Sequence, residues 1–209
     1  MAKIGKKPVF VDGLRVTDEE TMNIIETVAG KANNKLVSII RKMGGRSKGV
    51  SGKSGNLFVT EKQKANVDLG FVGNVAKVNT DVINTKLKEG YIPVVSPIGV
   101  GADGHAYNIN ADSAAAELAT ALKAEKFILV TNVAGVLDKE GKLIQRLTLI
   151  QARKLLESDV VSGGMIPKLR ACIRALEEGV QKAHIVKASR HAILEEILTK
   201  EGTGTMITR

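Results

Sequence analysis

The residue types best suited to chemistry in this 209-residue chain form a glycine-rich run before an expected helix. In Ser162-Gly163-Gly164-Met165-Ile166-Pro167-Lys168, two glycines lead into a helix whose first turn carries a lysine. Free backbone N–H groups, the positive end of the helix dipole and an ammonium group together favour a bound anion such as phosphate. The alternative interpretation of Lys168 is a solvated lysine on the helix surface.

A second polar group follows a glycine-rich loop at the end of an expected strand. Asn108, Asn110 and Asp112 place two carboxamides and a carboxylate at the start of an alanine-rich helix. Taken alone, Asn110 and Asp112 are more simply explained as helix caps. A third polar loop, residues 131–138, follows the next expected strand. Ligands of parallel α/β sheets bind beyond the carboxyl ends of the strands, which makes these loops candidate binding segments.

Two further glycine motifs resemble nucleotide-binding signatures without meeting their requirements. Residues 99–104 satisfy GxGxxG, but no helix opens at the third glycine and no acidic residue ends the following strand, so we expect a glycine-rich turn. Gly52-Lys53-Ser54 has the ending of a P-loop, but Ser47 stands where the first glycine is needed, and a helix end is expected before the motif. We therefore interpret Lys53 as a lysine in a solvated loop.

The first part of the chain predicts one long helix. A capping box with Thr17 as N-cap and Glu20 three residues later opens this helix, and Gly44-Gly45 ends it. Its apolar residues recur along one stripe, which we expect to face the core. The stripe consists of Met22, Ile25, Val28, Ala32, Leu36, Ile39 and Met43. Residues 46–64 are basic and rich in Gly and Ser, and they predict a hairpin or surface loop around a short strand at 57–60.

Further along the chain, short apolar strands alternate with amphipathic helices. Helices are expected at 80–89, 112–122, 148–158, 166–178 and 192–199, and strands at 91–97, 127–131, 183–186 and 205–208. This order predicts an α/β fold of three layers, α/β/α, with a mostly parallel central sheet.

Composition narrows the class of function. The net charge is +9, and residues 1–64 hold most of the excess, with 13 Lys+Arg against 6 Asp+Glu. Aromatic residues make up 3% and Trp is absent, so the stacking platforms of single-strand nucleic-acid binders are not expected, and nucleic acid is not the predicted partner. No apolar run reaches the length of a membrane helix, so we expect a cytoplasmic protein with no membrane partner. Cys172 is a single cysteine, which excludes an internal disulfide.

Segments over essentially the whole chain resemble, in the same order, those of acetylglutamate kinases in the amino acid kinase superfamily. They are FVDGLRVTDEE, SGKSGNL, LGFVGNV, YIPVVSPIGVGADGHAYNINADSAA, TNVAGVLD, SGGMIPKL and KEGTGTMI. The resemblance implies the carbamate kinase-like fold and phosphoryl transfer from ATP to the side-chain carboxylate of N-acetyl-L-glutamate, a step of arginine biosynthesis. It implies no protein-held metal, because Mg²⁺ arrives with ATP. It also implies an acetylglutamate-binding lobe with the basic hairpin in residues 1–110 and an ATP-binding lobe in residues 111–209.

The resemblance further implies roles for individual residues. Lys168 is expected to stabilise charge on the transferring phosphoryl group, and Asp112 to orient the catalytic lysines. Arg15 is expected to hold the α-carboxylate of the substrate, a task that suits a planar guanidinium, and Asn108 to bind the substrate with Asn110 beside it. The implied nucleotide-binding positions are Thr131, Asn132, Gly135, Val136, Leu137, Val160, Val161, Ser162, Gly163 and Gly164.

The chain departs from the family pattern at both ends. In the family, a strand with a second catalytic lysine and a strand with a GGGP loop precede the part that matches residues 7–13, so we expect an N-terminally truncated member with weak or no activity on its own. The alternatives are a non-catalytic nucleotide-binding or regulatory module of this fold, or another superfamily member. Residues 184–191 replace the family's Asp-Gly-Arg turn, while the tail resembles arginine-inhibited members and suggests L-arginine as a feedback inhibitor. Without the family's hexamer-building helix, we expect at most a homodimer.

Overall fold

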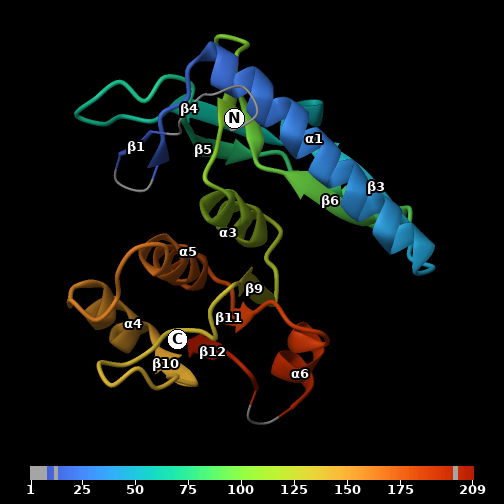
Figure 1. Ribbon diagram of the computed structural model, residues 1–209. Helices are drawn as coiled ribbons and strands as arrows, with labels where there is room; N and C mark the ends of the chain where they lie inside the picture. Colours follow the sequence, from blue (N-terminus) through green and yellow to red (C-terminus); the bar gives the residue numbers. More distant parts are fainter. Residues whose placement is uncertain (1–8, 12–13, 200–201) are drawn as a thin grey trace. The chain divides into compact units, whose positions relative to one another are not determined.

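The computed structural model describes residues 9–11, 14–199 and 202–209 of the chain. These residues fold into two compact units, Met1–Ala114 and Ala115–Arg209, which are described separately below. Helices and strands alternate along both units (Figure 1), which confirms the predicted α/β class. None of the helices in the described ranges is long and apolar enough to cross a membrane.

Helix α1, Glu19–Lys42, is the long helix of the first unit. Its N-cap is Asp18, whose Oδ1 accepts the Thr21 N–H at 2.9 Å. Thr17 is fully buried instead, and its hydroxyl donates to the carbonyl of Arg15 at 2.7 Å. The predicted cap is therefore wrong by one residue, because the hydroxyl of Thr17 is bound to the strand before the helix.

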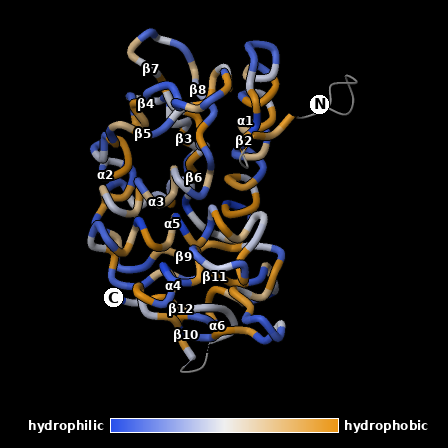
Figure 2. The backbone as a smooth tube through the Cα atoms, turned by 90° about the vertical axis from the view of Figure 1, so that its left-hand side faces the viewer, coloured by the Kyte–Doolittle hydropathy of each residue, from blue (hydrophilic) through white to orange (hydrophobic). Residues whose placement is uncertain are grey.

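The predicted core stripe of α1 is largely exposed. Met22 is buried, but Val28, Leu36, Ile39 and Met43 leave 58%, 51%, 43% and 82% of their surface exposed. The buried positions of the helix are Thr21, Met22, Asn33 and Val37. The core prediction for this stripe is wrong, because periodicity identifies an apolar face without identifying what covers it. The hydrophobic residues along α1 can be followed in Figure 2.

Two parallel strands pack against α1 in this unit (Figure 1). They are β3, Ser47–Ser51, and β6, Ile92–Ser96, which follows helix α2, Asp81–Lys88. The predicted surface loop at 46–64 is therefore wrong in its first part, which is a strand. The physical reason is burial: Ser47 and Val50 are inside the unit although the segment is basic and glycine-rich.

A mixed sheet completes the first unit, in the order β5-β4-β7-β8. Strand β4, Phe58–Lys62, pairs antiparallel with β5, Gly73–Val78, and parallel with β7, Ile98–Gly101. Strand β8, Ala106–Asn108, folds back on β7 as a hairpin. The GxGxxG run lies in this hairpin, which confirms that it is a turn and not a dinucleotide loop. Strand β1, Phe10–Val11, pairs antiparallel with β2, Leu14–Arg15, in a separate two-stranded sheet.

The second unit has one four-stranded sheet, in the order β10-β12-β11-β9. Strand β9, Lys126–Thr131, is parallel to β11, Lys182–Lys187. Strand β12, Thr205–Thr208, is antiparallel to β11 and parallel to β10, Arg146–Thr148. Its helices are α4, Leu149–Leu156, α5, Met165–Glu177, and α6, Ala192–Leu198, and α3, Ala111–Ala121, runs into it from the first unit. These bounds agree with the predicted helices to within a few residues.

Strand β11 shows that helices cover both faces of this sheet. Ala183 and Ile185 point into the cluster made with α4 and α5, which also holds the fully buried Cys172. The alternate residue His184 is buried on the opposite face, where it contacts Glu196 of α6. Because successive side chains of a strand point to opposite faces, the second unit has the predicted α/β/α layers.

Candidate functional site

A cavity of about 470 Å³ lies in the second unit beyond the carboxyl end of β9. Its lining combines the loop after β9 with the glycine-rich entry to α5. The lining residues are Thr131, Asn132, Val133, Gly135, Val136, Leu137, Val160, Val161, Ser162, Gly164, Met165 and Lys168. The structure thus brings together ten residues that the sequence singles out. Gly163 is outside this lining, and Val133 and Met165, which are not among the predicted nucleotide-binding residues, are part of it.

The backbone hydrogen bonds at the start of α5 restrict which N–H groups can bind an anion. The N–H of Met165 donates to the carbonyl of Ser162, and that of Ile166 to the carbonyl of Gly163. Pro167 has no N–H. Gly163 and Gly164, in the loop before α5, have backbone N–H groups for which no acceptor is found among the described residues, so donors for an anion lie in the loop as well as at the helix end. Gly163 has φ +54°, a conformation that favours glycine.

Thr205 holds the other wall of this cavity. Its Oγ1 accepts the N–H of Val136 at 2.9 Å and donates to the carbonyl of Ile144 at 2.7 Å. Gly135 passes so close that a Cβ there would lie 2.5 Å from Thr205 Oγ1. Thr205 and Val136 are both fully buried. The loop is therefore fixed by β12, 69 residues further along the chain.

In the first unit, Thr17 links two of the predicted substrate residues. Its hydroxyl donates to the carbonyl of Arg15 and accepts the side-chain N–H of Asn108 at 3.3 Å. The backbone N–H of Asn108 donates to the carbonyl of Phe71 at 2.8 Å. The guanidinium carbon of Arg15 lies 4.7 Å from the ring centroid of Phe10. The structure therefore connects Arg15 and Asn108 through a buried hydroxyl that the sequence interpretation assigned to a helix cap.

Asn110 and Asp112 stand at the start of α3. The Oδ1 of Asn110 accepts the N–H of Ser113 at 3.1 Å, so Asn110 caps the helix and keeps its amide N–H₂ for other partners. Asp112 is half-buried in the first turn. Asp112 belongs to the first unit and Lys168 to the second, so the two predicted catalytic residues come from different units.

The hairpin that carries Asn108 is stabilised by a carboxylate in its turn. Asp103 accepts the phenol O–H of Tyr107 at 2.7 Å and the N–H of His105 at 3.0 Å. Donation from the Tyr107 phenol, then from the His105 N–H, holds the pKa of Asp103 below its usual value. The same hydrogen bond raises the pKa of Tyr107 above its usual value. Both shifts favour a charged Asp103 beside a protonated Tyr107.

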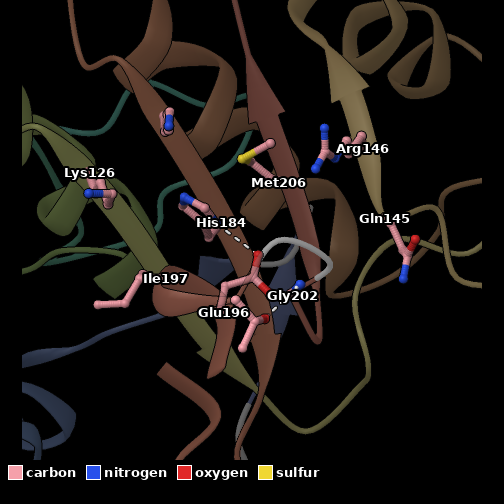
Figure 3. Close-up of a pocket in the computed structure, with 10 residues that line it drawn as sticks. Lys126, Gln145, Arg146, His184, Glu196, Ile197, Gly202 and Met206 are labelled. Carbon is pink, nitrogen blue, oxygen red and sulfur yellow. Dashed lines mark hydrogen bonds and ion pairs between the residues drawn. The ribbon is translucent and has the colours of Figure 1, made fainter. Parts of the chain in front are cut away.

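A second cavity, of about 260 Å³, opens beside α6 (Figure 3). The buried carboxylate of Glu196 meets His184 Nδ1 at 2.8 Å and accepts the N–H groups of Thr203 and Gly204 at 2.7 and 2.8 Å. The buried Nε2 of His184 has no hydrogen-bond partner among the described residues. Three basic side chains also line this cavity, those of Lys126, Arg146 and Lys182.

The first cavity is lined by groups that suit a polyphosphate ligand. It offers glycine N–H groups, the positive end of α5 and the ammonium of Lys168, together with apolar walls. No group of three or more His, Cys, Asp or Glu that could hold a metal occurs within the described ranges. A divalent cation that reaches such a site bound to phosphate oxygens fits this donor set.

The comparisons with known proteins agree with this chemistry. The sequence pattern described as the amino acid kinase family matches residues 1–187. An acetylglutamate kinase of Caldanaerobacter subterraneus subsp. tengcongensis is 50% identical over 212 residues, which cover 99% of this chain and 71% of the relative. The chain belongs to the acetylglutamate kinases of the amino acid kinase family. It is therefore a kinase, a phosphotransferase. An acetylglutamate kinase of Methanocaldococcus jannaschii is 48% identical, with 100% of this chain and 75% of the relative covered.

Solved structures show the same fold. N-acetylglutamate synthase of Neisseria gonorrhoeae, complexed with coenzyme A and N-acetyl-glutamate, matches with a TM-score of 0.89 and 27% identity, over 100% of this chain and 48% of that one. A second structure of that synthase, with coenzyme A and L-arginine, has a TM-score of 0.86 and 27% identity, over 99% and 50%. Carbamate kinase of Giardia lamblia bound to AMP-PNP has a TM-score of 0.67 at 15% identity, over 90% and 71%, and shows the shared fold.

Proposed function

We propose that this chain transfers the γ-phosphoryl group of MgATP to the side-chain carboxylate of N-acetyl-L-glutamate. The observation that carries the proposal is the cavity of the second unit, where two glycine-containing loops and Lys168 meet. In this proposal the adenine and ribose lie against the loop after β9, and the phosphates lie toward Gly163, Gly164 and Lys168. The names of the acetylglutamate kinase relatives supply the acceptor.

The proposed roles of the side chains follow from their charge. Lys168 stabilises negative charge on the transferring phosphoryl group, because phosphoryl transfer depends mainly on positioning and charge neutralisation. Asp112 orients the catalytic ammonium groups. Arg15 holds the α-carboxylate of the substrate, and Asn108 donates to the substrate with Asn110 beside it. Magnesium enters as part of MgATP, held by the phosphate oxygens.

Two measurements test this function. Calorimetry should detect binding of both MgAMP-PNP and N-acetyl-L-glutamate, and ADP release should require N-acetyl-L-glutamate. Replacing Lys168 by Ala should lower turnover by about 10² to 10³, whereas replacing Lys154, an exposed lysine of α4, should leave it unchanged. Binding of both ligands is the first criterion. Failure to bind either ligand would contradict the proposal.

We also propose that the cavity beside α6 binds L-arginine as a feedback inhibitor. The lining combines the buried carboxylate of Glu196 with three basic side chains, which suit the α-carboxylate of L-arginine. Glycine at position 202 leaves room for the Glu196 carboxylate, because a Cβ at that position would lie 2.7 Å from Glu196 Oε2. The synthase structure with L-arginine and the tail KEGTGTMI support this assignment. Calorimetry should show L-arginine binding that Glu196→Gln weakens and that L-citrulline does not reproduce.

The exposed stripe of α1 supports a homodimer as the proposed assembly. Val28, Leu36, Ile39 and Met43 form an apolar surface on one helix. The first half of α1 is acidic and the second half basic, so antiparallel pairing with a second copy places opposite charges together. Light scattering should give a dimer mass for the native chain and a monomer mass for Leu36→Glu. A dimer that survives this substitution would contradict the interface.

A further inference from the structure

We propose that the first unit contains a second anion site, which binds the phosphate group of a small metabolite in the cavity beside the Gly52-Lys53-Ser54 loop. This cavity measures about 340 Å³ and is walled by α1, by the loop after β3 and by the ends of β6 and β7. The residues that contribute polar groups are Ser51, Lys53, Ser54 and Ser96, together with Glu26 of α1. No role in the kinase reaction uses this cavity.

The Gly52-Lys53-Ser54 loop follows a strand, as a P-loop does, although the sequence predicted a helix end before it. Strand β3 ends at Ser51, so the motif follows the carboxyl end of a parallel strand and not a helix end. That end of a parallel sheet is where ligands bind in α/β folds. The loop forms a short 3₁₀ turn, Ser54–Asn56, in place of the helix of a P-loop. The site therefore has the residues of a phosphate loop in a different local geometry.

The loop is fixed before any ligand arrives. The N–H of Gly52 donates to the carbonyl of Ser96 at 3.2 Å, and the N–H of Phe58 donates to the carbonyl of Gly52 at 2.8 Å. Only glycine fits at position 52, because a Cβ would lie 2.0 Å from the carbonyl oxygen of Ile98. Asn79 Nδ2 also donates to the carbonyl of Gly55 at 2.9 Å. Such preorganisation lowers the conformational entropy that binding must cost.

Among the donors of the cavity, Ser96 gives the strongest evidence for a ligand. The residue lines the cavity although only 6% of its surface is exposed. Its oxygen accepts the side-chain N–H of the buried Asn33 at 3.1 Å, which leaves the hydroxyl hydrogen without an acceptor among the described residues. A buried hydroxyl normally finds a partner for its hydrogen. A ligand oxygen in the cavity supplies that partner.

The other polar residues that line the cavity also offer hydrogen-bond donors. Ser51 Oγ accepts the Lys53 backbone N–H at 3.3 Å, so its hydrogen is also available, and the Ser54 hydroxyl has no hydrogen bond within the described residues. The Lys53 ammonium lies 2.8 Å from Glu26 Oε1, which uses one of its three N–H donors. Three serines and one lysine therefore line one cavity, and its single carboxylate, Glu26, is paired with Lys53.

This set of donors favours a phosphate group over a carboxylate. A phosphate presents three terminal oxygens and up to two negative charges, enough acceptors for all of these donors. The cavity is in the size range of small-molecule sites and is larger than a phosphate group alone. The rest of the metabolite has room over Gly30, where no atom lies within 4 Å of a Cβ position, and beside Ile98.

The test is a titration of the isotope-labelled full chain followed by NMR, with inorganic phosphate and with glycerol 3-phosphate at constant ionic strength. Potassium chloride and acetate serve as comparison anions. We expect backbone shifts at Lys53 and Ser54 with both phosphates, with glycerol 3-phosphate binding more tightly. In Lys53→Met the affinity should fall about tenfold or more, while Lys48→Met, an exposed lysine of β3 outside the cavity, should bind as the native chain does.

A second variant separates binding from folding. Ser96→Ala removes the buried hydroxyl and should weaken phosphate binding while the NMR spectrum keeps its dispersion. Shifts spread over surface lysines, or equal binding by Lys53→Met and the native chain, would overturn the proposal. Equal binding of acetate and phosphate would overturn the assignment to phosphate. Because the readout is confined to residues of the first unit, the result is independent of whether ATP binds in the second unit.

Discussion

Thr205 fixes one wall of the cavity that is proposed to bind the nucleotide. Thr205→Val keeps the shape of the side chain but removes the acceptor for the Val136 N–H and the donor to the Ile144 carbonyl. Leaving a buried N–H without a partner costs about 1 to 3 kcal/mol. We expect a loss of that size in urea unfolding, together with weaker MgAMP-PNP binding.

A neighbouring threonine provides the control for this experiment. Thr203→Val changes an exposed residue whose backbone N–H, not its hydroxyl, bonds to Glu196. It should leave both the free energy of unfolding and nucleotide binding close to those of the native chain. If Thr205→Val bound MgAMP-PNP as tightly as Thr203→Val does, the wall of the cavity would not depend on this hydroxyl.

Asp103 and Tyr107 give a prediction about pH. The chain has two tyrosines, so in a Tyr91→Phe background only Tyr107 titrates. Asp103→Asn should lower the pKa of Tyr107, because the carboxylate that accepts its O–H and opposes the phenolate charge is gone. The ultraviolet absorbance of tyrosinate measures this shift. Asp159→Asn, a change at an exposed aspartate of the second unit, should leave the titration unchanged; an equal shift there would contradict the assignment.

The same pair sets the direction of a stability change with pH. The pKa of Asp103 is lowered in the folded state, so its contribution is present above the pKa of an unfolded aspartate, about 3.9, and is lost as the pH falls. The pKa of Tyr107 is raised, so its contribution is present below the pKa of an unfolded tyrosine, about 10, and is lost as the pH rises through the folded value. Between these limits the hairpin keeps both contributions.

The roles of single residues were only partly readable from the sequence. The glycine run before Lys168 was recognised because its residues are adjacent in the chain. Thr17 and Thr205 were missed because their partners Asn108 and Val136 are 91 and 69 residues away. Thr17 also carries a strong local signal for a cap, and the cap moved to Asp18 because a buried hydrogen bond used its hydroxyl. Local patterns describe such residues only when tertiary contacts do not compete.

At the scale of elements, Asn33 and Gly49 fix α1 on the parallel strands. Asn33 donates to the Val94 carbonyl at 2.7 Å, and its Oδ1 lies 2.2 Å from where a Cβ on Gly49 would be. Gly49→Ala should therefore destabilise the chain by about 1 to 3 kcal/mol. In an Asn33→Ala background the added methyl has room, so the two losses should not add. Urea unfolding of the four variants measures this coupling, and additive losses would contradict the contact.

The boundaries of helices and strands were predicted well where the apolar periodicity is strong and the apolar face is buried. The helices from α3 to α6 and the strands β9, β11 and β12 lie within a few residues of their expected positions. Strand β3 was missed because Lys48 and Gly49 disfavour a strand locally, while burial of Ser47 and Val50 against α1 decides its conformation. The exposed stripe of α1 was misassigned because an apolar face looks the same in sequence whether a core or a partner covers it.

At the scale of the whole molecule, each unit supplies one half of the proposed reaction. The first unit carries Arg15 and Asn108, which are proposed to bind the acid substrate, and the second carries the cavity with Lys168 that is proposed to bind the nucleotide. The sequence interpretation divided the chain after residue 110, close to the start of the helix that joins the units. What periodicity could not provide is the arrangement within each half, since the loops that meet in each site come from distant segments.

Because the second unit has its own core, a nucleotide should stabilise that unit selectively. Hydrogen exchange, measured peptide by peptide with and without MgAMP-PNP, should slow in β9, β11 and α5, whose buried side chains form one cluster. At a ligand concentration of 100 times Kd the expected gain is about 2.7 kcal/mol. N-acetyl-L-glutamate should instead protect β8 and the start of α3, where Asn108 and Asn110 lie. Equal protection of both units by MgAMP-PNP alone would show that they open as one cooperative body and not as two.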